Sequence, residues 1–230
     1  MITKRLVCLA NSRKLNGRCV AGIELVAMAP RGWIRPVSER EHGEVSEYER
    51  QYSDGSDPRV LDVLDVPLQE PRPWLFQQEN WLLDPKHYWA RNGTLDWPEL
   101  AGFTVVRPLW VNGYSTYNGH NDKVPLSVAS GLTSSLMLIQ ADAIRLTVFA
   151  PGEAFGNAKR RVQARFHHAG DEYRLWVTDP RYERSYLAKP DGSYDLGEVY
   201  LTVSLGEPKD DDCYKLVAAI VERSSLGGPS

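Results

Sequence analysis

The chain has 230 residues, of which 42% are hydrophobic, 25% charged and 10% aromatic, with a formal net charge of −3 at pH 7. This composition is typical of a folded globular protein with one large or two small domains, and the net charge argues against a generally basic nucleic-acid binder. No stretch reaches the roughly 18 apolar residues of a membrane helix and no signal peptide is apparent, so we expect a cytoplasmic protein with no membrane partner.

Strand patterns dominate the first 70 residues. Apolar and β-branched runs bounded by Gly, Pro, Asn or Ser predict strands over 5–10, 19–28, 33–37 and 60–68. A Pro-Arg-Gly turn joins the second and third of these strands into a hairpin. The polar, acidic segment 39–58 predicts a short helix followed by a loop.

The segment 71–128 has a different character. Five of the seven Trp residues and five Pro residues fall within 71–117. Because so many Pro residues interrupt regular elements, we predict an irregular connector here, held to its neighbours by aromatic side chains.

The second strand-rich part covers 129–222. Strands are predicted over 134–150, 160–168, 172–178, 198–206 and 213–222, and the turn Ala-Gly-Asp-Glu indicates a hairpin between the second and third. The small polar residues 223–230 predict a flexible tail.

About five short strands in each part favour a mainly β protein with two OB-like Greek-key barrels. The first barrel would cover 1–70 and could take strands from the connector, and the second would cover 129–222. A β-sandwich remains the structural alternative, because strand number alone does not separate the two architectures.

Two hairpins carry the same surface chemistry. Alternation along 31–37 places Arg31, Trp33 and Arg35 on one face of the first hairpin. In the second hairpin, the alternate residues Val162, Ala164 and Phe166 point inward. The opposite face carries Arg161, Arg165, Arg174 and Trp176.

An indole between guanidinium groups can stack on a base while the arginines neutralise phosphates. We therefore predict a surface for nucleic acid, with single strands favoured. The same arrangement also occurs as a cation–π pair on a sheet that binds nothing. The predicted nucleic-acid-binding residues are Arg13, Lys14, Arg18, Arg31, Trp33 and Arg35 in the first barrel, and Arg161, Arg165, Arg174 and Trp176 in the second.

Three segments resemble the bacterial dual OB-containing domain family. They are VCLANSRKLNGRCVAGIEL with GWIRPVSERE near the N-terminus, ARFHHAGDEYRLWVTDPRYE in the middle, and VYLTVSLGEP with CYKLVAAIVE near the end. The resemblance implies two OB barrels, binding of nucleic acids or nucleotides, and links to prokaryotic anti-phage defence. It implies no catalytic residues.

The sequence shows no nucleotide-binding glycine loop and no set of metal ligands with suitable spacing. Cys8, Cys19 and Cys213 lie in apolar runs, and we expect them to be buried thiols. We therefore expect a protein that is not an enzyme and needs no cofactor or metal. Two alternatives remain open: an adaptor that docks onto a nuclease or helicase partner, and a sensor of small nucleotides.

Overall fold

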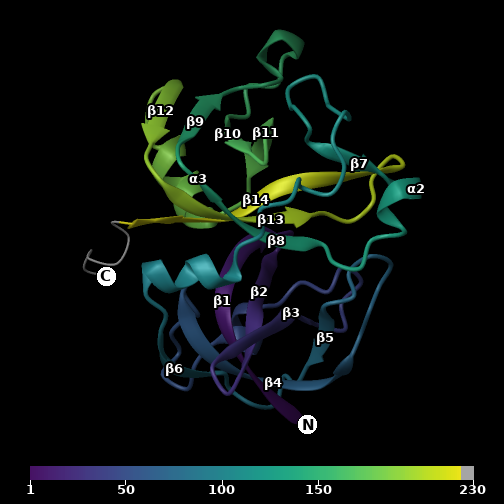
Figure 1. The fold of residues 1–230 in the computed structure, drawn as a ribbon, viewed down its shortest axis with the longest axis vertical. Helices are drawn as coiled ribbons and strands as arrows, with labels where there is room; N and C mark the ends of the chain where they lie inside the picture. The colour runs from purple at the N-terminus through teal and green to yellow at the C-terminus, as the bar shows by residue number, and fades with distance from the viewer. Residues whose placement is uncertain (224–230) are drawn as a thin grey trace. The chain divides into compact units, whose positions relative to one another are not determined.

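The computed structural model describes residues 1–223, which form two compact units (Figure 1). The first unit contains residues 1–103 and 132–135, and the second contains residues 104–131 and those from 136 onward. Each unit is described by itself below.

The first unit is a closed five-stranded barrel. Its elements are β1 (Ile2–Lys14), β2 (Gly17–Val26), β3 (Ala29–Val37), α1 (Glu47–Arg50), β4 (Asp62–Pro71), β5 (Asn80–Leu83), β6 (Ala90–Thr94) and a 3-10 helix (Trp97–Phe103). The strands follow the order β1-β2-β3-β5-β4, and an antiparallel β4–β1 pair closes the ring. The β3–β5 pair is parallel. This is the strand order of the OB fold, and the closure excludes a sandwich.

The core of this barrel follows the expected alternation. Leu6 and Cys8 on β1 point inward together with Leu64 and Val66 on β4. A side chain at Gly22 on β2 would lie 2.1 Å from a backbone oxygen of β1, so this crossing requires glycine.

The prediction that Arg35 faces solvent is wrong. Its neighbour Ile34 lies in the core, so Arg35 does point away from the core as alternation requires, but its side chain is only 3% exposed. Glu79, just before β5, pairs with its guanidinium at 3.0 Å, and Ser135 accepts a hydrogen bond from it at 2.5 Å. Sequence-distant segments therefore cover this side of β3, and Arg35 is part of a buried ion pair.

The second unit is also closed. Its elements are β7 (Lys123–Pro125), α2 (Leu126–Ala129), β8 (Leu136–Ala141), β9 (Ile144–Phe149), a 3-10 helix (Glu153–Phe155), β10 (Arg161–His168), β11 (Asp171–Val177), α3 (Pro180–Leu187), β12 (Gly192–Leu196), β13 (Val199–Leu205) and β14 (Asp212–Glu222). Only two residues separate β8 from β9. They act as one interrupted strand, in which β8 pairs with β13 and β9 pairs with β10.

The remaining pairs complete the ring, because β10 pairs with β11, β11 runs parallel to β14, and β14 pairs with β13. With β8 and β9 counted as the first strand, this is the OB order again. The core combines the inward residues of these strands with Tyr182 and Tyr186 of α3. Asp179 begins α3 by accepting hydrogen bonds from two backbone amides of its first turn. The prediction of a mainly β chain with two OB-like barrels is confirmed.

The structure divides the chain differently from the predicted boundaries at 70 and 128. Residues 71–103 supply β5, β6 and a 3-10 helix to the first barrel, and residues 104–128 belong to the second unit. Trp89 and Trp97 are buried, so part of the expected connector is core. In the predicted tail 223–230, residues 224–230 lie outside the described residues.

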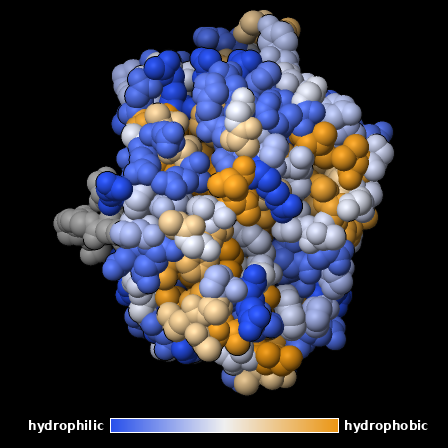
Figure 2. Space-filling view, in the orientation of Figure 1, coloured by the Kyte–Doolittle hydropathy of each residue, from blue (hydrophilic) through white to orange (hydrophobic). Residues whose placement is uncertain are grey.

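The surface mixes apolar and polar residues, and on the face drawn in Figure 2 the apolar patches are interrupted by hydrophilic ones. Within residues 1–223, no helix has the length and apolar character needed to cross a membrane.

We predict that Glu79→Ala lowers the free energy of unfolding by about 3–5 kcal/mol, because it leaves the buried Arg35 charge without its partner. Urea unfolding at neutral pH measures the change. Glu70→Ala is the matched control, since Glu70 faces Arg72 at 3.7 Å with both side chains more than half exposed. Glu70→Ala should lower the free energy of unfolding by less than about 1 kcal/mol. Equal losses in the two variants would contradict the stabilising role of the buried pair.

Candidate nucleic-acid interface

The outer surface of β9, β10 and β11 gathers the predicted residues of the second barrel. Val162, Phe166, Leu175 and their alternating neighbours point into the core, which turns the residues between them outward. We call these outward residues the strand face. They are Arg145, Thr147 and Phe149 on β9, Arg161, Gln163, Arg165 and His167 on β10, and Glu172, Arg174 and Trp176 on β11.

Three arginines form a row across the strand face. Arg165 lies directly opposite Arg145 on one neighbouring strand and directly opposite Arg174 on the other. Like charges in directly opposed positions destabilise a sheet, because their side chains start about 5 Å apart. Arg145 and Arg165 are exposed and Arg174 is half-buried, so the row lies on the outer surface of the sheet.

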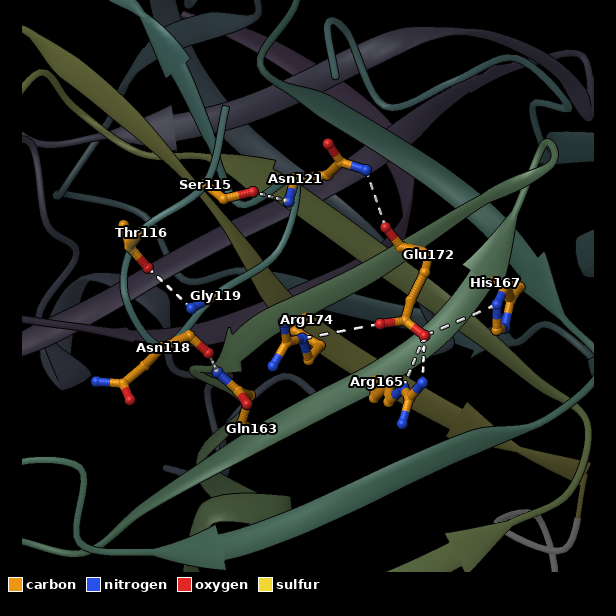
Figure 3. Close-up of polar contacts among 10 residues, drawn as sticks. All are labelled: Ser115, Thr116, Asn118, Gly119, Asn121, Gln163, Arg165, His167, Glu172 and Arg174. Carbon is orange, nitrogen blue, oxygen red and sulfur yellow. Dashed lines mark hydrogen bonds and ion pairs between the residues drawn. The ribbon is translucent and has the colours of Figure 1, made fainter. Parts of the chain in front are cut away.

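Two carboxylates partly balance the row. Asp195 on β12 accepts two hydrogen bonds from Arg145, at 2.6 and 3.1 Å. The Glu172 carboxylate accepts a hydrogen bond from Arg165 at 2.8 Å (Figure 3). It also lies 3.8 Å from Arg174 and 3.9 Å from His167. Partial burial acts to raise the pKa of Glu172, but Arg165 and the other cations hold it below its ordinary value.

Arg174 is the least satisfied member of the row. Its Nε is buried and has no hydrogen-bond partner within residues 1–223, and its one ion pair is the long contact with Glu172. The Arg174 side chain is 42% exposed, so its guanidinium group can still take an additional anionic partner from solvent.

Trp176 is half-buried at the other end of the strand face. The guanidinium of Arg161 lies 4.1 Å from the centre of its ring, and the Phe149 ring lies 5.7 Å away at an angle of 30°. The prediction of an uncovered stacking platform therefore needs revision, because Arg161 already covers one side of the indole. The arrangement presents a guanidinium group over the indole, and guanidinium planes can also stack on bases.

A loop from the expected connector also lies against this surface. The backbone of His120 pairs with that of Arg174, with hydrogen bonds of 3.0 and 3.2 Å. The Gln163 amide donates to the Asn118 carbonyl at 2.7 Å, and the Asn121 amide donates to the Glu172 carbonyl at 3.0 Å (Figure 3). We call residues 113–122 the edge loop.

The predicted residues of the first barrel are not brought together. Arg13 and Arg18 lie opposite each other beside Lys14 at the β1–β2 turn. Arg31 and Trp33 lie toward the far end of β2, about 20 Å away at the usual rise per residue. With Arg35 buried, this barrel presents two small basic regions instead of one face.

Comparison with known protein families matches residues 4–220 to the dual OB-containing domain. The chain belongs to this family. The match covers nearly the whole chain and agrees with the two closed barrels. No curated protein and no solved structure matches the chain.

OB folds as a class bind oligonucleotides on the face of their second and third strands and on the loops beside it. In the second barrel of this dual OB chain, β10 and β11 are those strands, because β8 and β9 together form the first. The strand face therefore coincides with the position that the fold class uses most often.

Arg145, Phe149 and the edge loop lie outside the set of binding residues predicted from the sequence. The alternation of Ile144, Leu146 and Val148 already indicated that Arg145 points outward. Its position opposite Arg165, however, depends on the register between β9 and β10, which alternation does not give.

Two of the three cysteines, Cys8 and Cys213, are buried. Burial raises the pKa of the Cys8 thiol to about 12 and that of Cys213 to about 11, so both stay protonated near neutral pH. Cys19, expected to be buried, is half-buried. Among residues 1–223, no group of three or more His, Cys, Asp and Glu side chains has an arrangement that could hold a metal ion.

Lys215 holds the beginning of the segment that leads into the edge loop. It is 1% exposed, and its ammonium donates to the Val111 carbonyl at 2.7 Å and to the Asn112 side chain at 3.2 Å. Burial lowers the pKa of Lys215 to about 7, although Asp122 and Asp171 oppose the shift.

We predict that Lys215 makes stability depend on pH above neutrality. The pKa of the Lys215 amine is about 7 in the folded state and has its ordinary value of 10.5 in the unfolded state. Between these two pH values the folded amine is neutral while the unfolded amine stays protonated. The unfolded state then binds more protons, so stability rises with pH in this window. Between about pH 7 and pH 9, the parent should gain up to about 1.4 kcal/mol per pH unit over Lys215→Met.

Urea unfolding of both proteins at several pH values measures this gain. Lys159→Met, at an exposed lysine of the same barrel, is the matched control. A parent-to-variant difference that does not change with pH would contradict the prediction.

Proposed function

We propose that the protein binds single-stranded or distorted nucleic acid through the strand face of its second barrel and acts without catalysis. The row formed by Arg145, Arg165 and Arg174 is the observation on which this proposal rests. The row places three guanidinium groups side by side across neighbouring strands, against the two carboxylates of Asp195 and Glu172, which leaves an excess of positive charge for a further anion.

The chemistry of the strand face fits a phosphate backbone with unpaired bases. A guanidinium group can donate two parallel hydrogen bonds to a phosphate, and the side chain of Arg174 is 42% exposed with only a long contact to Glu172 among the described residues. Phe149, Trp176 and the Arg161 plane supply stacking surfaces at the end of the row. Phosphate contacts and stacking discriminate little between bases, so we expect weak sequence preference. Because the contacts to phosphate are ionic, we also expect a strong dependence of affinity on salt.

The β9–β10 loop joins two strands of the strand face. Phe155 is exposed in this loop, and Lys159 follows four residues later. In OB folds the corresponding loop contacts the oligonucleotide. We propose that this loop holds one end of the bound strand.

The proposal includes a role in anti-phage defence, which the resemblance to the dual OB-containing domain family implies. Phage infection of a host expressing the parent or an Arg174→Ala variant would test that role.

An adaptor function is the second candidate. At the β2–β3 turn of the first barrel, Val26 and Met28 are exposed beside a hollow lined by Leu25 and Arg5, which a partner protein such as a nuclease or helicase could cover. Recovery of a stoichiometric partner, with no affinity of the purified chain for oligonucleotides, would favour the adaptor. Displacement of a bound oligonucleotide by mononucleotides alone would instead favour the nucleotide sensor.

We predict that Arg174→Ala weakens the binding of a fluorescent oligothymidylate by about 10- to 100-fold at low salt, since a charged hydrogen bond contributes about 1.5–3 kcal/mol. The slope of log affinity against log salt should become shallower by about 0.7, the value for one phosphate contact on a single strand. Fluorescence anisotropy at several salt concentrations measures both quantities.

Arg184→Ala is the matched control, because Arg184 is an exposed arginine of the same unit that lies on α3 and not on the strand face. It should leave affinity and salt slope unchanged. Equal weakening by both substitutions would show that general charge, and not the row, holds the strand.

A further inference from the structure

We propose that Tyr117 in the edge loop is a stacking residue, held in advance beside the arginine row to receive a base of the bound strand. The inference rests on the proposed function and extends it to a segment outside the barrel strands.

Tyr117 has an unusual environment for an aromatic residue. It is 93% exposed, the largest exposed fraction of any large hydrophobic side chain within residues 1–223. A single exposed tyrosine on a loose loop would need no explanation. The edge loop, however, is tightly bonded on both sides of this residue.

The hydrogen bonds around Tyr117 fix its backbone. Asp122 accepts hydrogen bonds from the Thr116 amide at 2.7 Å and from the Thr116 hydroxyl at 2.6 Å. The same hydroxyl accepts a hydrogen bond from the Gly119 amide at 3.0 Å, which closes a turn around Tyr117 (Figure 3). A side chain at Gly119 would lie 1.9 Å from the Asp122 carboxylate, so the turn requires glycine there.

A second set of contacts fixes the base of the loop. The side-chain oxygen of Asn121 accepts a hydrogen bond from the Gly113 backbone amide at 2.7 Å, and the Asn121 backbone amide donates to the Ser115 hydroxyl at 3.0 Å. The backbone of Lys215 donates to the Asp122 carbonyl at 2.8 Å. The barrel therefore holds the loop in one shape.

The loop also places Tyr117 near the strand face. The carbonyl of the next residue, Asn118, accepts the hydrogen bond from Gln163, and Gln163 lies directly opposite Trp176. Three residues beyond Tyr117, His120 pairs with the backbone of Arg174. A strand whose phosphates follow the arginine row would thus pass the edge loop.

Ordering a flexible side chain or loop on binding reduces affinity. Because the edge loop is already ordered, Tyr117 can stack on a base with a smaller loss of entropy. Stacking on an aromatic ring tolerates every base, which matches the weak sequence preference proposed above.

Anisotropy with the same oligothymidylate tests the inference. We expect Tyr117→Ala to weaken binding by about 5- to 100-fold, the range for loss of one stacked base, and Tyr117→Phe to bind like the parent because the ring is kept. Gly119→Ala retains the ring but disturbs the turn, and should weaken binding in the same direction. Tyr48→Ala, at a tyrosine of α1 in the first unit that is 83% exposed, is the matched control and should change nothing.

The outcomes separate the two proposals. If the parent and Tyr117→Ala bind equally well while Arg174→Ala binds more weakly, the role of Tyr117 is overturned and the proposed function stands. If the parent does not bind oligonucleotides at low salt, both fail. Weakening by Tyr117→Phe equal to that by Tyr117→Ala would assign the effect to the hydroxyl and overturn stacking.

Discussion

Each barrel depends on one strand that pairs on both of its edges. In the first unit β1 bonds to β2 and β4, and in the second the interrupted strand β8–β9 bonds to β10 and β13. Closure leaves no free edge within each ring of five strands and gives every strand of the ring one inner and one outer side. The inner sides form the two cores, which leaves the chemistry of the outer sides open to functional use.

The outer sides of the two barrels are used differently. On β3 the outward Arg35 is buried and forms an ion pair with Glu79, so its charge is part of a buried contact within the first unit. On β9–β11 the outward arginines remain at the surface with fewer carboxylates than guanidinium groups. The same residue type on the same kind of strand therefore has a structural role in one barrel and forms a candidate binding surface in the other.

The edge loop shows how a segment without regular structure becomes part of a site. Its hydrogen bonds come from side chains of Thr116, Asn121 and Asp122 and from the backbone of β11. The buried Lys215 secures the segment that precedes it, although burial of an amine is costly and lowers its pKa. This network gives a loop near the strand face a fixed shape, which a binding residue requires.

The sequence by itself determined the β class and the outward direction of Arg165, Arg174 and Trp176, because alternation between core and surface is a local property of a strand. The strand pairing that closes each ring decided between two barrels and a sandwich. The tertiary structure decided which outward residues stay accessible. Burial of Arg35, the cover of Arg161 on Trp176 and the opposition of Arg145 to Arg165 all arise between segments distant in sequence. Register and coverage depend on such contacts, and periodicity within one strand carries no information about them.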